Sequence, residues 1–170
     1  MKKLKLGIIG AGRIGKVHTA TLVQSVPSAV VVALADINPD SANELANTFG
    51  IPAVFKNYMD VINHPEVEAI VICSPTDTHA KYIIEAAKAG KHIFCEKPVD
   101  LSLEVIKGAL KAVAAAGVKL MVGFNRRFDP NFMKIKQLVA EGKIGDPHIL
   151  KITSRDPAPP PAEYSAVSGG

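Results

Sequence analysis

Three glycines near the start of the chain have the spacing of a dinucleotide-binding turn. Gly10, Gly12 and Gly15 follow an apolar run that ends at Ile9, in the pattern Gly-x-Gly-x-x-Gly. The first glycine permits a tight turn from strand to helix, the second lets a pyrophosphate approach the backbone, and the third lets the helix pack closely on the sheet. The free N–H groups at the start of that helix attract phosphates. The motif therefore predicts a dinucleotide site, and an ordinary glycine-rich turn is the alternative.

An acidic residue, Asp36, ends the next apolar run, twenty-one residues after the last glycine. A carboxylate at this position accepts hydrogen bonds from the ribose hydroxyls of adenosine and repels a 2′-phosphate. No arginine follows in the next few residues to bind such a phosphate, so the sequence favours NAD over NADP. Ile37 is expected to pack on the adenine. The alternatives are that Asp36 only begins a turn with Asn38 and that Ile37 contacts no ligand.

Polar clusters follow three later apolar runs. Ser-Pro-Thr-Asp-Thr-His at 74–79 follows one run, Glu-Lys-Pro at 96–98 follows the next, and Gly-Phe-Asn-Arg-Arg at 123–127 follows the last. In open α/β sheets, ligands bind beyond the carboxyl ends of the strands. The three clusters are therefore expected to converge on the crevice that holds the dinucleotide.

Lys97 is the candidate catalytic residue. It follows an apolar run and lies between Glu96 and Pro98, so we do not expect a freely solvated surface lysine. A cation beside a reacting carbinol oxygen stabilises a developing alkoxide and eases the loss of hydride. The alternative is that Lys97 simply forms an ion pair with Glu96.

Other basic side chains give less definite signals. His79 opens a helix near the crevice, where it either touches the cofactor or is a satisfied capping or core residue. Arg126 and Arg127 either bind a phosphate or substrate hydroxyls, or pair with Asp129. The remaining histidines that we considered carry no functional signal; they are His18, His64 and His148.

Composition limits the classes of function. The 170 residues carry 20 basic and 16 acidic side chains, a net charge of +4, and the basic residues are scattered. This distribution is not typical of a nucleic-acid-binding surface. No apolar run approaches the length of a membrane span, and no signal peptide is expected. Cys73 and Cys95 lack the spacing of a metal site and are expected to be reduced core thiols in a cytoplasmic protein.

The elements that would position these groups alternate between strands and helices. Continuous apolar runs typical of parallel strands buried on both faces occur at 4–9, 30–35, 69–73, 92–95 and 119–123. Helical signals separate them, including an Asn38 cap with Pro39 and a helix from Ser102 to Gly117. The alternation predicts an α/β fold with a doubly wound parallel (Rossmann) sheet. We expect this dinucleotide-binding domain to occupy residues 1–124.

The last segment, residues 125–170, departs from this pattern. A helix is expected from Asp129 to Gly142, followed by a strand at 148–154 and a proline-rich loop. No element closes the segment, so the chain looks cut, and the family resemblance given next implies that the start of a truncated C-terminal α+β domain lies here. A natural disordered tail is the alternative.

Taken together, these motifs resemble the N-terminal half of the Gfo/Idh/MocA family of sugar and polyol oxidoreductases. The resemblance covers the whole chain, and Glu-Lys-Pro at 96–98 is far more specific than the glycine motif. Residues 123–130 and 154–161 resemble the inositol 2-dehydrogenase branch. The residues expected to bind the cofactor are Gly10, Gly12, Arg13, Ile14, Gly15, Asp36, Ile37, Ser74, Thr76, His79, Glu96, Lys97 and Arg127, with no metal.

The resemblance implies NAD-dependent oxidation of a ring hydroxyl of a polyol or sugar to a ketone, assisted by Lys97. It also implies that an Asp-x-x-x-His motif with the general base, the substrate domain and a homo-oligomer interface lie beyond Gly170. The expectation is that this chain binds NAD without full activity. A non-catalytic NAD-binding or sensing module is the alternative function.

Overall fold

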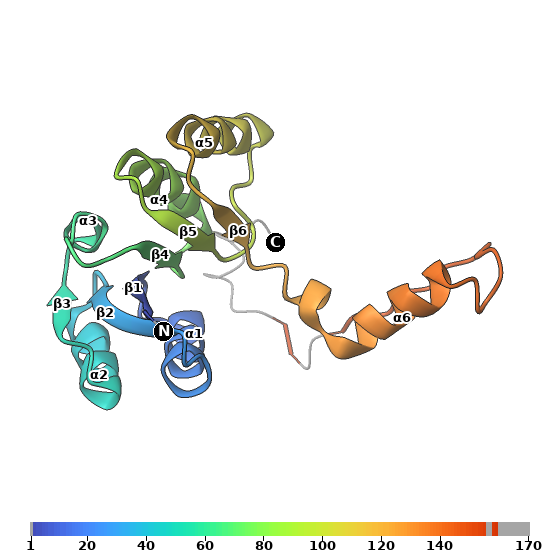
Figure 1. Ribbon diagram of the computed structural model, residues 1–170, viewed down its shortest axis with the longest axis horizontal. Coiled ribbons are helices and arrows are strands. Elements are labelled where there is room, and N and C mark those ends of the chain that lie inside the picture. The colour runs from blue at the N-terminus through green and yellow to red at the C-terminus, as the bar shows by residue number, and fades with distance from the viewer. Residues whose placement is uncertain (1, 156–157, 160–170) are drawn as a thin grey trace.

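Six parallel strands form one sheet in the computed structural model, which describes residues 2–155 and 158–159 (Figure 1). The strands lie in the order β3-β2-β1-β4-β5-β6, so the progress of the chain across the sheet reverses between β1 and β4. This order is the doubly wound Rossmann arrangement, and the predicted fold class is confirmed. The strands are β1 (Leu4–Ile9), β2 (Ala29–Ala35), β3 (Ala53–Phe55), β4 (Ala69–Ile72), β5 (His92–Cys95) and β6 (Leu120–Val122).

Helices cover the two faces of the sheet (Figure 1). On one face lie α1 (Arg13–Ser25) and α2 (Pro39–Phe49), and on the other lie α3 (Tyr58–Ile62), α4 (Thr76–Lys88) and α5 (Leu103–Ala116). Ile8 packs in the core on the side of α2, with Leu45, whereas Ile9 packs on the side of α4, with Ile83. The central strands β1, β2 and β4 thus bury most of both faces, which explains why the sequence shows continuous apolar runs and not alternation.

Helix ends follow the local signals in the sequence. The side chain of Asn38 accepts a hydrogen bond from the backbone N–H of Asp40, and Gly50 ends α2 with φ +67°. Ser102 caps α5 in the same way, and Gly117 ends it with φ +66°. An asparagine or serine oxygen satisfies a free N–H at the start of a helix, and glycine adopts the left-handed conformation at its end without a steric penalty.

The register makes the carboxyl ends of the strands level with one another. Ile9 of β1 lies opposite Ala35 of β2 and Ile72 of β4. Cys95 of β5 lies opposite Ile72, and Val122 of β6 lies opposite Cys95. The segments that follow these strands therefore begin side by side along one edge of the sheet, and they begin at Gly10, Asp36, Cys73, Glu96 and Gly123.

Two features of the fold differ from the sequence analysis. β3 and α3 were not predicted, because β3 has three half-buried residues and lacks a continuous apolar run. The strand expected at 148–154 is wrong: these residues form no strand, and Ile149 and Leu150 are 90% and 81% exposed. Apolar composition alone does not make a strand, since a strand needs a neighbour to pair with its backbone.

The expected helix after Asp129 is present as α6 (Pro130–Ala140), which follows the short 3₁₀ helix η1 (Asn125–Phe128). Asp129 caps α6 by accepting hydrogen bonds from two backbone N–H groups. No residue of α6 is buried, and Figure 1 shows it extending away from the sheet. The division of the chain at residue 124 stays a prediction. None of the helices among the described residues combines the length and apolar character that crossing a bilayer requires.

Two isoleucine-to-alanine substitutions test whether α6 contributes to the stability of the sheet domain. Ile83 on α4 is fully buried, whereas Ile135 on α6 is 58% exposed. We expect Ile83→Ala to lower the free energy of unfolding by about 2–5 kcal/mol because it leaves a cavity in a packed core. Ile135→Ala should change it by less than about 0.5 kcal/mol. Urea unfolding followed by circular dichroism measures both, and equal losses would show that α6 packs as part of the domain.

Candidate functional site

The glycine turn after β1 is packed so closely that two of its positions require glycine. Gly10 has φ +106°, and a Cβ there would lie 2.7 Å from the carbonyl oxygen of Cys73. A Cβ at Gly15 would lie 1.9 Å from the carbonyl oxygen of Gly10. Because neither contact is sterically possible, these two glycines set how closely α1 approaches β1 and β4.

Gly12 has no such packing reason to be glycine. A Cβ there would meet no atom within 4 Å, and its φ of −69° suits any residue. The open space lies at the start of α1, where no side chain caps the helix and no acidic residue lies in the first turn. A free helix N-terminus beside an uncovered backbone suits a pyrophosphate group. Arg13 is exposed and Ile14 half-buried at the same end of α1.

Asp36 connects the glycine turn to the start of α2. Its Oδ2 accepts a hydrogen bond from the backbone N–H of Ala11 at 2.6 Å, and its Oδ1 accepts one from the N–H of Asn38 at 2.7 Å. The turn with Asn38 is therefore confirmed. Contact of Asp36 with a ribose stays a prediction. Ile37 is 80% exposed beside it, so an apolar surface is available for an adenine ring.

The clusters after β4, β5 and β6 meet, as the sequence predicts. His79 at the start of α4 contacts the carbonyl oxygens of Ser74, at 2.8 Å, and Pro98, at 2.7 Å. A Cβ at Gly123 would lie 3.2 Å from the carboxylate of Glu96, so the end of β6 lies against the turn that carries Lys97. Ser74 is half-buried and its hydroxyl lies 2.6 Å from that of Thr78; Thr76 is the first residue of α4.

The side chain of His79 is buried, and both of its ring nitrogens contact backbone groups of this chain. It is 2% exposed, and each of its ring nitrogens faces a carbonyl oxygen. Both ring nitrogens therefore lie within hydrogen-bond distance of an acceptor inside the chain. The satisfied core role that the sequence left open is thus the role observed. Contact of a ring nitrogen with a cofactor would replace one of these bonds.

The structure tests one of the two sequence expectations for Lys97. The residue is exposed at the end of β5. Its backbone N–H donates to Oε2 of Glu96 at 3.1 Å, but the side-chain partner of the Glu96 carboxylate is His18 and not the Lys97 ammonium. The alternative of a Lys97–Glu96 ion pair is therefore wrong for the described residues, and the catalytic role of Lys97 stays a prediction.

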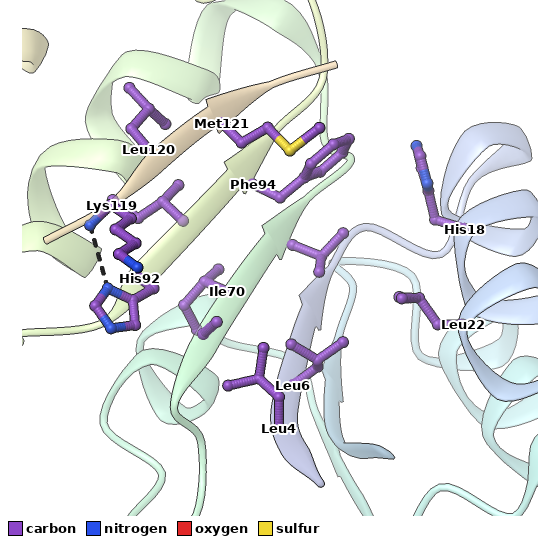
Figure 2. Close-up of a pocket in the computed structure, with 13 residues that line it drawn as sticks. Leu4, Leu6, His18, Leu22, Ile70, His92, Phe94, Lys119, Leu120 and Met121 are labelled. Carbon is purple, nitrogen blue, oxygen red and sulfur yellow. Dashed lines mark hydrogen bonds between the residues drawn. The ribbon is translucent and has the colours of Figure 1, made fainter. Parts of the chain in front are cut away.

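His18 is the residue that the sequence analysis missed. Its Nε2 lies 2.7 Å from Oε1 of Glu96, and its ring contacts the edge of Phe94 with the centroids 5.1 Å apart. Figure 2 shows His18 projecting from α1 near Phe94 at the end of β5. Its position, three residues after Gly15 on the helix that faces the sheet, is the only signal that could have suggested this contact.

The two cysteines are core residues, as the sequence predicted. Burial raises the pKa of Cys73 to about 12, and the negative charge of Glu96 and the neighbouring Cys95 contribute to the same shift. Burial likewise raises the pKa of Cys95 to about 12, again with a contribution from Glu96. Both thiols stay protonated near neutral pH. Among the described residues, no cluster of three or more His, Cys, Asp or Glu side chains could hold a metal ion.

Arg126 and Arg127 lie on η1, beyond β6. The Arg126 guanidinium lies 5.2 Å from the centroid of the Phe132 ring. The carboxylate of Asp129 caps α6, and no ion pair between it and either arginine occurs in the described part of the chain. The proposed pairing is therefore wrong, and Arg127 is exposed, with its side chain available to a ligand.

An apolar groove of about 720 Å³ lies on the face of the sheet that α1 covers only in part (Figure 2). Leu4 and Leu6 of β1, Phe94 of β5 and Met121 of β6 line it, with Leu22 on α1. It is distinct from the level edge where the glycine turn, Asp36 and the Lys97 turn meet. The groove has few polar groups to orient a charged ligand, so we assign the site to that edge.

Comparison with known proteins gives the family and the relatives that this domain matches. The Gfo/Idh/MocA family model, described as an oxidoreductase family with an NAD-binding Rossmann fold, matches residues 4–124. An inositol 2-dehydrogenase of Rhizobium meliloti is 47% identical over 168 residues, which are 98% of this chain and 50% of that protein. The chain spans about half the length of the curated relatives it matches.

Solved structures give the same result. A probable dehydrogenase from Thermotoga maritima superposes with a TM-score of 0.92 and 45% identity, covering 98% of this chain and 50% of the other. A scyllo-inositol dehydrogenase from Lactobacillus casei, solved with bound NAD(H) and scyllo-inositol, superposes with a TM-score of 0.82 and 36% identity, covering 85% and 43%. The predicted NAD-binding Rossmann domain is confirmed.

Two alanine substitutions in the glycine turn should have different effects. Gly12→Ala meets no atom and no backbone strain, so we expect the free energy of unfolding to change by less than about 0.5 kcal/mol. It should nevertheless weaken NADH binding by at least about tenfold, because its methyl group occupies the path of the pyrophosphate. Gly15→Ala should lower both stability and binding. Fluorescence titration and urea unfolding test this, and unchanged NADH affinity in Gly12→Ala would place the pyrophosphate elsewhere.

Proposed function

The chain belongs to the Gfo/Idh/MocA oxidoreductase family, and we propose that it is the NAD-binding half of a dehydrogenase that oxidises a ring hydroxyl of an inositol-like polyol or sugar. The observation that carries this proposal is the level edge along which the glycine turn, Asp36 and the turn at 96–98 each follow a strand. The inositol dehydrogenases among the relatives and solved structures support the substrate class.

The strand that each residue follows indicates which part of the dinucleotide it would bind. Asp36 and Ile37 follow β2 and would hold the adenosine, while Gly12, Arg13 and Ile14 at the start of α1 would hold the pyrophosphate. The nicotinamide half then extends over β4 and β5, toward Ser74, Thr76 and the turn at 96–98. When bound, NAD supplies a nicotinamide ring that accepts hydride from the carbinol carbon. We assign Arg127, which follows β6, to the outer rim of this half.

Lys97 is the proposed catalytic residue. Its exposed ammonium can reach a hydroxyl group placed over the end of β5, where the positive charge stabilises oxygen as it becomes anionic. The histidines beside it are engaged, because His79 contacts two carbonyl oxygens and His18 contacts Glu96. We therefore propose that residues 1–170 bind NAD without full turnover and that a longer protein supplies the general base.

The remaining proposals concern the cellular compartment, the oligomeric state and the partners of the protein. Buried, protonated thiols at Cys73 and Cys95 are consistent with the reducing conditions of the cytoplasm. For a longer protein that includes this chain, we propose a homo-oligomer that acts on a small polyol or sugar, without a nucleic acid or membrane partner.

The charge of Asp36 should determine the preference for NAD. We expect the chain to bind NADH more tightly than NADPH, and Asp36→Asn to reduce the difference by about tenfold because it removes a charge that repels the 2′-phosphate. The asparagine keeps one oxygen to accept from the backbone. Asp40→Asn, on the exposed first turn of α2, is the matched control and should leave the ratio of the two dissociation constants unchanged. Equal or tighter binding of NADPH by the unmodified chain would contradict the assignment.

Removal of the Lys97 ammonium should affect turnover more than cofactor binding. In a protein that joins this chain to the second half its relatives possess, we expect Lys97→Ala to lower kcat by about 10²–10³. The dissociation constant for NAD should change by less than about threefold, since the pyrophosphate and adenosine contacts remain. Steady-state kinetics with myo-inositol and scyllo-inositol measure kcat. Near-normal kcat in Lys97→Ala would remove Lys97 from the mechanism, and absence of turnover in the unmodified protein would favour the non-catalytic module.

A further inference from the structure

The turn that carries Lys97 is attached to the rest of the domain by two histidines from different helices. His79 of α4 contacts the carbonyl oxygen of Pro98 at 2.7 Å, and His18 of α1 contacts the carboxylate of Glu96 at 2.7 Å. Lys97 lies between these two attachment points. Its own ammonium makes no ion pair with another described residue, so its position depends on the backbone of the turn.

The carboxylate of Glu96 lies at the centre of one attachment. One of its oxygens faces His18 and the other accepts from the backbone N–H of Lys97 at 3.1 Å. The end of β6 packs against the same carboxylate, since a Cβ at Gly123 would approach it to 3.2 Å. The carboxylate thus joins α1, the Lys97 backbone and β6, and the glycine at 123 leaves the space that it occupies.

His18 holds this carboxylate from the helix that begins at the glycine turn. Because an ionised carboxylate only accepts, Nε2 of His18 carries the hydrogen of this bond. The side chains are 25% and 17% exposed, and hydrogen bonds to a charged group are shorter and stronger than neutral ones when water is partly excluded. Contact with the Phe94 ring fixes the plane of the imidazole.

We propose that His18 and Glu96 form a positioning pair that fixes the Lys97 turn relative to the start of α1. The inference rests on the proposed function, because the start of α1 is where the pyrophosphate would bind and the Lys97 turn is where the nicotinamide would lie. β1 and β5 are not neighbours in the sheet, since β4 separates them. The pair therefore directly connects the element that would hold the pyrophosphate with the turn that would lie against the nicotinamide, which the sheet alone does not do.

A positioning role differs from a purely structural role in what it affects. Loss of the pair should release the Lys97 turn and leave the glycine turn and Asp36 in place. The nicotinamide of bound NADH should then lose its fixed surroundings, whereas ADP-ribose, which has no nicotinamide, should bind as before. General damage to α1 would weaken both ligands together.

The test measures the fluorescence lifetime of NADH bound to the 170-residue chain, together with the dissociation constants of NADH and ADP-ribose. His18→Ala should move the lifetime of bound NADH toward that of free NADH and leave the dissociation constant of ADP-ribose unchanged. His18→Gln should restore the lifetime, because its amide can donate to Glu96 from a similar position. Should His18→Ala not fold, Glu96→Ala removes the same contact from the other side and provides the comparison.

Two further variants test whether the change in lifetime comes from the His18–Glu96 contact and acts through the Lys97 turn. Glu44→Ala breaks the Lys16–Glu44 ion pair, which also joins α1 to a neighbouring element, and should leave the lifetime unchanged. In a Lys97→Ala background, His18→Ala should produce no additional shift, because His18 acts through the turn that presents Lys97.

The outcomes separate the two proposals. Equal weakening of NADH and ADP-ribose in His18→Ala, an unchanged lifetime, failure of His18→Gln to restore it, or a full additional shift in the Lys97→Ala background would each overturn the positioning pair. If the unmodified chain binds neither NADH nor ADP-ribose, the proposed function itself fails, and the pair fails with it.

Discussion

The close approach of α1 to the carboxyl ends of β1 and β4 is the constraint on which the rest of the site depends. A side chain at Gly15 would occupy the position of the Gly10 carbonyl, and one at Gly10 would overlap the end of β4. With both absent, the start of α1 lies beside the strand ends, where its free N–H groups can meet a phosphate. One turn later, the same approach brings His18 within 2.7 Å of Glu96 at the end of β5.

Two carboxylates link binding groups to the backbone that presents them. Asp36 holds the N–H of Ala11 in the glycine turn, and Glu96 holds the N–H of Lys97. A charge-assisted hydrogen bond to a backbone N–H fixes a turn more strongly than a neutral one. The acid proposed to select the cofactor therefore also holds the backbone of the glycine turn, and the acid beside the candidate catalytic lysine holds the backbone of that lysine.

Apolar surface gathers where the doubly wound sheet lacks a covering layer. Right-handed crossovers place α3, α4 and α5 on one face, so α1 and α2 leave part of the other face open above β4, β5 and β6. The apolar groove lies there, and α6 beyond β6 exposes Phe132, Met133 and Ile135. The run at 148–154 is exposed as well, without a strand beside it. Relatives of twice this length have further chain with which such surfaces could pack.

The sequence by itself determined five of the six strands, the ends of the capped helices and the cofactor, because continuous apolar runs, caps and glycine spacings act over a few residues. It also indicated which segments meet, since parallel strands end at one edge of the sheet. Only the tertiary structure decided the partners of side chains from distant segments. His18 contacts Glu96, and the two ring nitrogens of His79 contact the carbonyl oxygens of Ser74 and Pro98. The Lys97 ammonium forms no ion pair with Glu96. The tertiary structure also decided that 53–55 pairs as a strand and 148–154 does not. These outcomes depend on the order of the strands and on the neighbour each segment meets, and no local pattern encodes either.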